Sequence, residues 1–230
     1  MNNPMFTIKK FHKYLSLFIS IQLLLWTISG IFFSFNNIEL VRGEHLKKPA
    51  FQESFSVYEA KFVSDSATIT YHKRLSDLVV EVRDSSGIKY FDQTGNLVNK
   101  LSLDDAKNII TQRTYLSPTA IIEITEPQEG SEFRGRSLPL YKVESLSEEG
   151  KVINIYLNPY SGKVEALRSN QWRAWDFFWG LHIMDWDQRE DFSNTLLRIF
   201  SILALFSALS GIVLFFRMRY RSSKKTDSSV

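Results

Sequence analysis

The sequence predicts an α+β domain, built of antiparallel sheets and short helices, between two transmembrane α-helices. Two apolar runs without a charged side chain, at 14–38 and 199–216, lie near the two ends of the 230-residue chain. Between them, short segments rich in β-branched residues alternate with turn residues, which is typical of strands. The overall composition, 44% hydrophobic and 23% charged, would suit a soluble protein, so the uneven distribution of charge along the chain is what predicts the spans.

The first apolar run, 14–38, is long enough to cross a bilayer, which takes about 20 residues. It exceeds the apolar core of a signal peptide, and no small-residue cleavage site follows it, so we expect an uncleaved anchor. The second run is shorter, but Leu196 and Leu197 extend it to a predicted span over 195–216. A buried core helix is the alternative for both runs, and their length argues against it.

The flanks of the two runs are basic. Residues 1–13 carry a net charge of +3 and residues 217–230 carry +4, so with +3 for the whole chain residues 14–216 sum to −4. Because Lys and Arg concentrate on the cytoplasmic side of membrane proteins, both flanks are expected in the cytoplasm and the middle of the chain outside. The basic residues cluster where lipid headgroups would lie, which argues against nucleic-acid binding.

The region between the spans alternates strand and helix signals. Residues 103–114 are expected to form a helix, with Ser102 as its N-cap and Asp104 and Asp105 in its first turn. The predicted strands are 67–71, 78–83, 88–91, 120–125, 140–145 and 152–157. The chain has no cysteine, so disulfides and thiolate chemistry are excluded.

Two segments, IKYFDQTGNLV at 88–98 and IYLNPYSGKV at 155–164, repeat one pattern. Each has a strand, then Asp92 or Asn158, then a turn ending in Gly95 or Gly162, then an apolar residue. An Asx residue starts such turns and glycine takes the positive-φ position. The repeat suggests two similar α+β half-domains.

The unit NPYSGKV after a DDAKNII helix resembles the PepSY domain. The opening FHKYLSL, the span ending WTISG and the LH pair before the second span resemble PepSY-associated transmembrane proteins. This resemblance implies a bacterial inner-membrane protein with a periplasmic PepSY-like domain at 39–170. It also implies a role in peptidase regulation or iron uptake, and some larger relatives are ferric-siderophore reductases thought to bind haem through membrane histidines.

Histidines are the candidate cofactor ligands. A b-type haem needs two axial ligands on opposite faces of one ring. His12 and His182 are predicted on opposite sides of a bilayer core of about 30 Å, so they cannot share a haem. His45 and His182 are predicted on the same outer side and form the candidate haem b pair. His72 lies beside a predicted strand. Interfacial or hydrogen-bonding histidines are the simpler alternative, and no metal site is predicted.

The stretch WDFFWGLHIMDW holds three of the five tryptophans of the chain. Residues 171–194 are predicted as an amphipathic interfacial helix whose aromatic residues lie at headgroup depth. Docking of this stripe against the domain or a partner protein is the rival explanation. The residues assigned to the membrane interface are Trp172, Trp175, Trp179 and Trp186.

The two spans are predicted to pack together. Ala204 with Ala208, and Ser207 with Gly211, give small-xxx-small spacing on the second span. Gly30 gives the first span a small surface. Gln22, a strongly polar group deep in the first span, should face the second span or a partner.

The chain lacks recognisable catalytic motifs such as HExxH, GxSxG or a phosphate-binding glycine loop. We therefore expect a non-enzymatic accessory, binding or regulatory module that contacts the lipid bilayer and a membrane or periplasmic protein partner, without a cofactor. The alternative is a haem-binding electron-transfer subunit of a ferric-substrate reductase.

Overall fold

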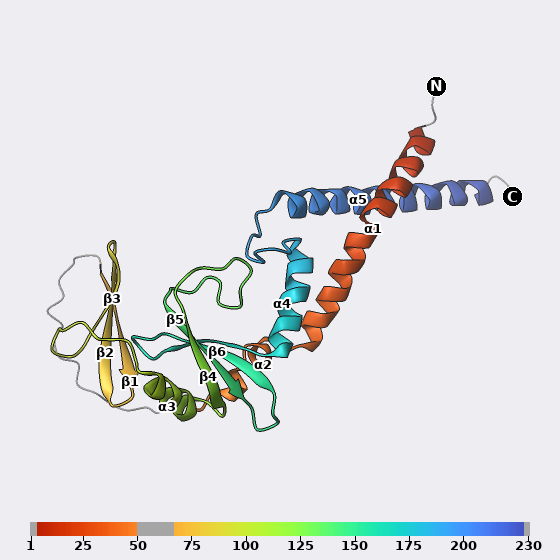
Figure 1. Ribbon diagram of the computed structural model, residues 1–230. Coiled ribbons are helices and arrows are strands. Elements are labelled where there is room, and N and C mark those ends of the chain that lie inside the picture. Colours follow the sequence, from red (N-terminus) through yellow and green to blue (C-terminus); the bar gives the residue numbers. More distant parts are fainter. Residues whose placement is uncertain (1–3, 50–66, 228–230) are drawn as a thin grey trace. The chain divides into compact units, whose positions relative to one another are not determined.

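The computed structural model describes residues 4–49 and 67–227 (Figure 1). The chain divides into two compact units. The helical unit consists of Met1–Phe35 together with Asp176–Val230, and the sheet domain is Asn36–Trp175. The two chain ends therefore belong to one unit, and the sheet domain is inserted between them.

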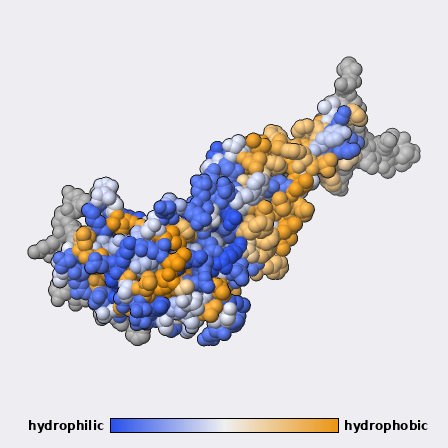
Figure 2. Space-filling model, in the orientation of Figure 1, coloured by the Kyte–Doolittle hydropathy of each residue, from blue (hydrophilic) through white to orange (hydrophobic). Residues whose placement is uncertain are grey.

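Two long helices dominate the helical unit. Helix α1 spans Pro4–Phe35 and helix α5 spans Thr195–Asp227. Within them, Phe6–Phe35 and Thr195–Met218 are long and apolar enough to cross a membrane. Their apolar side chains are largely exposed, and Figure 2 shows them as orange surface. The prediction of two apolar helices near the ends of the chain is confirmed.

The sheet domain holds two antiparallel sheets. The first has the strand order β1-β2-β3, and the second has the order β4-β5-β6-β7. The helices are α2 (Ile38–Val41), the 3-10 helix η1 (Glu44–Leu46) and α3 (Leu103–Arg113). The strands are β1 (Thr68–Arg74), β2 (Asp77–Asp84), β3 (Gly87–Phe91), β4 (Ser117–Ile124), β5 (Leu140–Leu146), β6 (Val152–Leu157) and β7 (Val164–Arg168). The expected antiparallel sheets with short helices are present.

Helix α3 packs its apolar face on the four-stranded sheet. Ile109 and Ile110 are fully buried and share a core cluster with β-strand residues such as Val143 and Ile155. Ser102 caps the helix, because its Oγ accepts a hydrogen bond from the backbone N–H of Asp105 at 3.1 Å. The helix and the N-cap match the sequence-based prediction.

Both repeated hairpin turns adopt the predicted conformation. Gly95 has φ = 88° and Gly162 has φ = 67°, in the left-handed region. The carboxylate of Asp92 accepts hydrogen bonds from the N–H groups of Thr94 and Asn96. The side chain of Asn158 accepts the corresponding bonds from Tyr160 and Ser161, both at 2.9 Å.

Helix α4 spans Asn170–Ile183 and is shorter than the predicted 171–194. Met184 has φ = 56°, which ends the helix. Asp185 then accepts hydrogen bonds from the backbone N–H groups of Gln188, Glu190 and Asp191, and so holds a folded loop in place of further helical turns.

Candidate functional site

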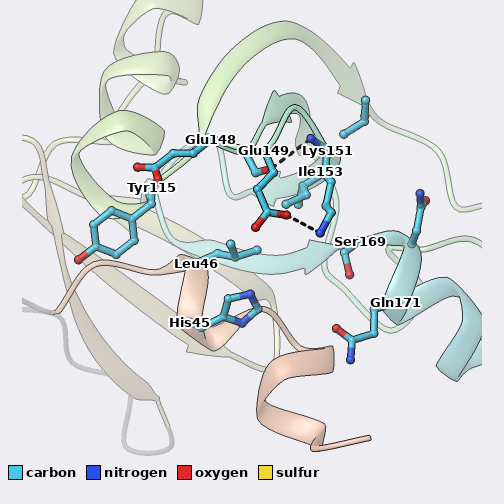
Figure 3. Close-up of a pocket in the computed structure, with 12 residues that line it drawn as sticks. His45, Leu46, Tyr115, Glu148, Glu149, Lys151, Ile153, Ser169 and Gln171 are labelled. Atoms are coloured by element: carbon cyan, nitrogen blue, oxygen red, sulfur yellow. Dashed lines mark hydrogen bonds and ion pairs between the residues drawn. The ribbon is translucent and has the colours of Figure 1, made fainter.

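A cavity of about 670 Å³ lies in the sheet domain beside His45, and we call it the His45 cavity (Figure 3). Helix η1 supplies His45 and Leu46. The turn between β5 and β6 supplies Glu148, Glu149 and Lys151, and the start of α4 supplies Gln171. The cavity therefore gathers segments that lie far apart in the sequence.

The walls of the His45 cavity combine polar and apolar groups. Glu149 and Lys151 form an ion pair across the β5–β6 turn. Leu46 and the buried Ile153 supply apolar surface, and Tyr115 adds an exposed aromatic ring. In the part of the chain that the structure describes, no group of three His, Cys, Asp or Glu residues is arranged to hold a metal ion. The cavity has the mixed lining of a binding site.

Glu132, in the long loop between β4 and β5, is the centre of a second polar cluster. One carboxylate oxygen accepts hydrogen bonds from Asn154 Nδ2 at 2.8 Å and from the Tyr156 hydroxyl at 3.1 Å. The other accepts one from Arg173 Nε on α4. Burial alone would raise the pKa of Glu132, but these donors, with Arg173 foremost, hold the pKa below its ordinary value.

Trp172 is part of the same region. Its side chain is 9% exposed, and the guanidinium groups of Arg168 and Arg134 lie 4.1 and 5.5 Å from its ring centroid. Burial, followed by repulsion from neighbouring arginines, lowers the pKa of Arg168 to about 10. Glu132 and Trp172 together fix the start of α4 on the sheet domain. Glu132 could not be predicted as a site residue, because its loop has no periodic pattern in the sequence.

The other tryptophans lie in different surroundings. Trp175 is half-buried in the last residues of the sheet domain. Trp179 lies in the helical unit, where its ring contacts Phe192 and its Nε1 donates to the carbonyl of Arg189 at 3.2 Å. Trp186 lies beyond α4 and is 57% exposed. The membrane-interface role of all four tryptophans stays a prediction.

His182 lies near the C-terminal end of α4, packed on α1. Its Nδ1 is 2.7 Å from the Ser29 hydroxyl, and its carbonyl accepts a hydrogen bond from Trp26 Nε1 at 2.8 Å. The ring centroid lies 5.6 Å from that of Phe33. Burial lowers the pKa of His182, which favours the neutral imidazole.

A row of polar contacts joins α1 to α5, and we call it the polar seam. His12 Nδ1 lies 2.8 Å from the Ser210 hydroxyl, and the Ser16 and Ser207 hydroxyls are 2.9 Å apart. A Cβ atom placed on Gly211 would lie 3.1 Å from the His12 ring. Two predicted packing positions, Ser207 and Gly211, thus face the first span.

Other predicted packing positions differ in their surroundings. Ala204 is half-buried, Ala208 is exposed, and a Cβ on Gly30 would meet no atom within 4 Å. Gln22 is 6% exposed, and its amide nitrogen has no hydrogen-bond partner among the described residues. The contact of His12 with Ser210 could not be predicted from the sequence, because the two residues are 198 positions apart.

The remaining histidines belong to the sheet domain. His72 is in β1, and its Nε2 lies 2.9 Å from a carboxylate oxygen of Glu81 on β2. His45 lines the His45 cavity, whereas His182 belongs to the helical unit. The pairing of His45 with His182 stays a prediction.

Comparison with known proteins identifies the family and no individual relative. The family model PepSY_TM, described as the PepSY-associated TM region, matches residues 9–229. Neither the curated proteins nor the solved structures give a match. The match covers nearly all of the first apolar helix, the whole sheet domain and the second apolar helix, so the chain belongs to the PepSY-associated TM family.

Proposed function

We propose that this membrane protein is a non-enzymatic accessory or binding module whose sheet domain faces the periplasm and binds a protein segment in the His45 cavity. The observation that carries the proposal is the cavity itself. It offers apolar surface at Leu46 and Tyr115, side-chain amide donors and acceptors at Gln171, and an ion pair at its rim. A peptide presents all three kinds of group, so this lining suits a polypeptide ligand.

The position of the cavity supports coupling between the ligand and the membrane segments. Gln171, which lines it, is in the first turn of α4, and Arg173 two residues later is held by Glu132. The same helix continues into the helical unit and ends at Ile183. A ligand that contacts Gln171 would therefore touch the helix that leads toward the second span.

Site-specific photo-crosslinking tests the proposal in cells. A photoreactive amino acid at Gln171, which is exposed at the cavity wall, should give one adduct of defined mass. The same probe at the exposed Lys89 on β3, away from the cavity, is the control. Replacing Tyr115 with Asp should remove the Gln171 adduct, because it places a charge on an apolar wall.

Two results would count against peptide binding at the His45 cavity. One is an equal pattern of adducts from Gln171 and Lys89, which would indicate random collisions. The other is an adduct from Gln171 that survives the Tyr115→Asp substitution, since the ligand would then not occupy the cavity.

Haem binding is the second candidate function, and the setting of His182 favours it. The Ser29 hydroxyl engages Nδ1, which is the arrangement that orients a ligating histidine and leaves Nε2 for a metal. The lowered pKa of His182 supplies the neutral imidazole that ligation requires. His182 would thus be a ligand of the haem iron, and bound haem would supply one-electron redox chemistry.

A visible absorption spectrum of the purified chain tests this candidate. Haem coordinated by both histidines would give a Soret band that His182→Ala and His45→Ala each remove to the same degree. A colourless protein after expression with added haem would exclude it, and loss of the band only in His182→Ala would exclude His45 as the partner.

A further inference from the structure

The sheet domain holds a second cavity, of about 660 Å³, which the proposed function does not use. Its walls come from the chain after η1, from β1, from the C-terminal end of α3 and from the start of β7. Its described lining residues include five cations and no acid, and we call it the basic cavity. The cations are Lys47, Lys48, Lys73, Arg113 and Lys163.

This clustering runs against the charge of the surrounding chain. The region between the two basic flanks, residues 14–216, carries a net charge of −4, yet the basic cavity collects cations on one surface. Like charges at short range repel one another, more strongly where the protein excludes water. Anionic groups, from the chain itself or from a ligand, would therefore stabilise such a cluster.

Carboxylates of the chain neutralise part of the cluster. Glu44 pairs with Lys47 at 2.8 Å, and Glu165 pairs with Lys163 at 3.3 Å. His72, which also lines the cavity, lies against Glu81. In the described part of the chain, these acids pair with Lys47 and Lys163 but with neither Lys48 nor Arg113.

Arg113 and Lys48 are bonded to carbonyl oxygens instead. Arg113 donates to the carbonyls of Gly162 and Lys73, and Lys48 Nζ donates to the carbonyl of Thr111 at 2.8 Å. Neither pairs with a carboxylate among the described residues. The pKa of Arg113 is lowered by burial, as expected of a cation that has lost water without gaining a counter-charge.

A purely structural role explains only part of this arrangement. Cations near the C-terminal end of a helix are stabilised by its dipole, and Arg113 links strand β1 to the turn before β7 through its bonds to the carbonyls of Lys73 and Gly162. A guanidinium has five N–H donors, however, and the two carbonyl bonds leave others for an oxyanion. Among the described residues, no carboxylate offsets the positive charges of Arg113 and Lys48, although Lys48 Nζ also lies 5.5 Å from the ring centroid of Tyr115.

We propose that the basic cavity binds a small soluble anion bearing two or more phosphate or carboxylate groups, held by Arg113 and Lys48. Arginine binds such oxyanions through paired N–H groups, and lysine adds a point charge. The basic cavity is separate from the His45 cavity, so a negative result for the proposed function would not bear on anion binding.

Calorimetric titration of the full-length chain in phosphatidylcholine nanodiscs tests the proposal, with pyrophosphate and citrate as probes. We expect saturable one-to-one binding of at least one probe, weakened by raising the salt concentration. Lys48→Gln should weaken that binding about tenfold, the effect of losing one charge-assisted hydrogen bond. Arg113→Gln should weaken it at least as much.

Lys89→Gln is the matched control, because it removes the same charge from an exposed lysine of β3 that lines neither cavity. Its affinity for the probe should equal that of the parent chain. If Arg113→Gln fails to fold, the comparison of Lys48→Gln with Lys89→Gln still decides the matter, since Lys48 is only half-buried and its Nζ donates to a carbonyl near the C-terminal end of α3.

Three results would overturn the proposal. The first is no detectable binding of either probe at millimolar concentration and low salt. The second is equal weakening by Lys48→Gln and Lys89→Gln, which would mean that net charge alone attracts the anion. The third is phosphatidylglycerol that co-purifies with the parent chain and is lost in Lys48→Gln by native mass spectrometry, which would assign the cavity to lipid phosphates.

Discussion

Replacing Gly162 with alanine should destabilise the sheet domain more than the same replacement at Gly150. Both glycines have positive φ, 67° and 74°. A left-handed conformation costs an alanine roughly 1–2 kcal/mol at either position. The two sites differ in the space around them, and that difference isolates the effect of packing.

The packing effect can be worked from the structure. A Cβ on Gly162 would lie 2.8 Å from Ile109 Cδ1, whereas a Cβ on Gly150 would meet no atom within 4 Å. Ile109 is 1% exposed and belongs to the main core, so it has little room to retreat. Overpacking of this kind costs about 1–3 kcal/mol. The expected loss of stability is therefore roughly 2–5 kcal/mol for Gly162→Ala and roughly 1–2 kcal/mol for Gly150→Ala.

Thermal unfolding of the full chain in detergent, followed by circular dichroism in the β-sheet region, measures the difference. Each kcal/mol should lower the melting temperature by about 2–8 °C for a domain of this size range. Equal melting temperatures for the two variants would refute the packing argument. If neither variant differed from the parent chain, the positive-φ argument would fail as well.

Three further predictions concern the contact between α1 and α5, the polar cluster at Glu132 and the membrane topology. Gly211→Leu should disrupt the α1–α5 contact at His12, whereas Gly30→Leu, at a site with open space, should not. The yield of disulfide crosslinking between engineered cysteines on the two spans compares the two variants. The pKa of Glu132 is lowered in the folded chain, so its stabilisation is complete above its ordinary pKa of 4.5 and is lost as the pH falls through the folded value. Glu132→Gln should flatten that part of the stability profile, and an unchanged profile would contradict the assignment. A reporter fused after Val230 should be active only in the cytoplasm, because the basic flanks favour that side, and activity only in the periplasm would reverse the predicted topology.

Much of the fold could be predicted because its signals are local. The two apolar runs are set by the absence of charge over a bilayer's length. The helix after Ser102 was predicted from a cap and an apolar face within eleven residues. The turns at Gly95 and Gly162 were predicted because an Asx residue and a glycine lie within one hairpin. Each of these patterns can be recognised from neighbours in the sequence, whatever its later packing.

The candidate sites could be predicted only in part, because they depend on distant partners. His12 and Ser210 are 198 positions apart, and their spans are otherwise apolar, so no short pattern links them. Glu132 receives its hydrogen bond from Arg173 across 41 positions. The basic cavity likewise joins cations from four segments, of which none is unusually basic by itself. His45 and His182 were chosen as candidate ligands because histidine is scarce in the chain, and no sequence pattern linked the two residues.

Helix α4 shows why amphipathic periodicity was an incomplete guide. Arg173 and Asp176 are three residues apart and opposite in charge, which is typical of an ion pair on a solvated helix face. In the structure each has a different, distant partner: Arg173 binds Glu132 in the sheet domain, and Asp176 pairs with Arg189 at 2.6 Å in the helical unit. Asp176 is only 2% exposed. Because a buried carboxylate requires a partner, the loop after α4 must fold back to bring Arg189 to it. That requirement, together with the N–H groups bound by Asp185, ends α4 at Ile183 and leaves Trp186 outside the helix that its spacing predicts.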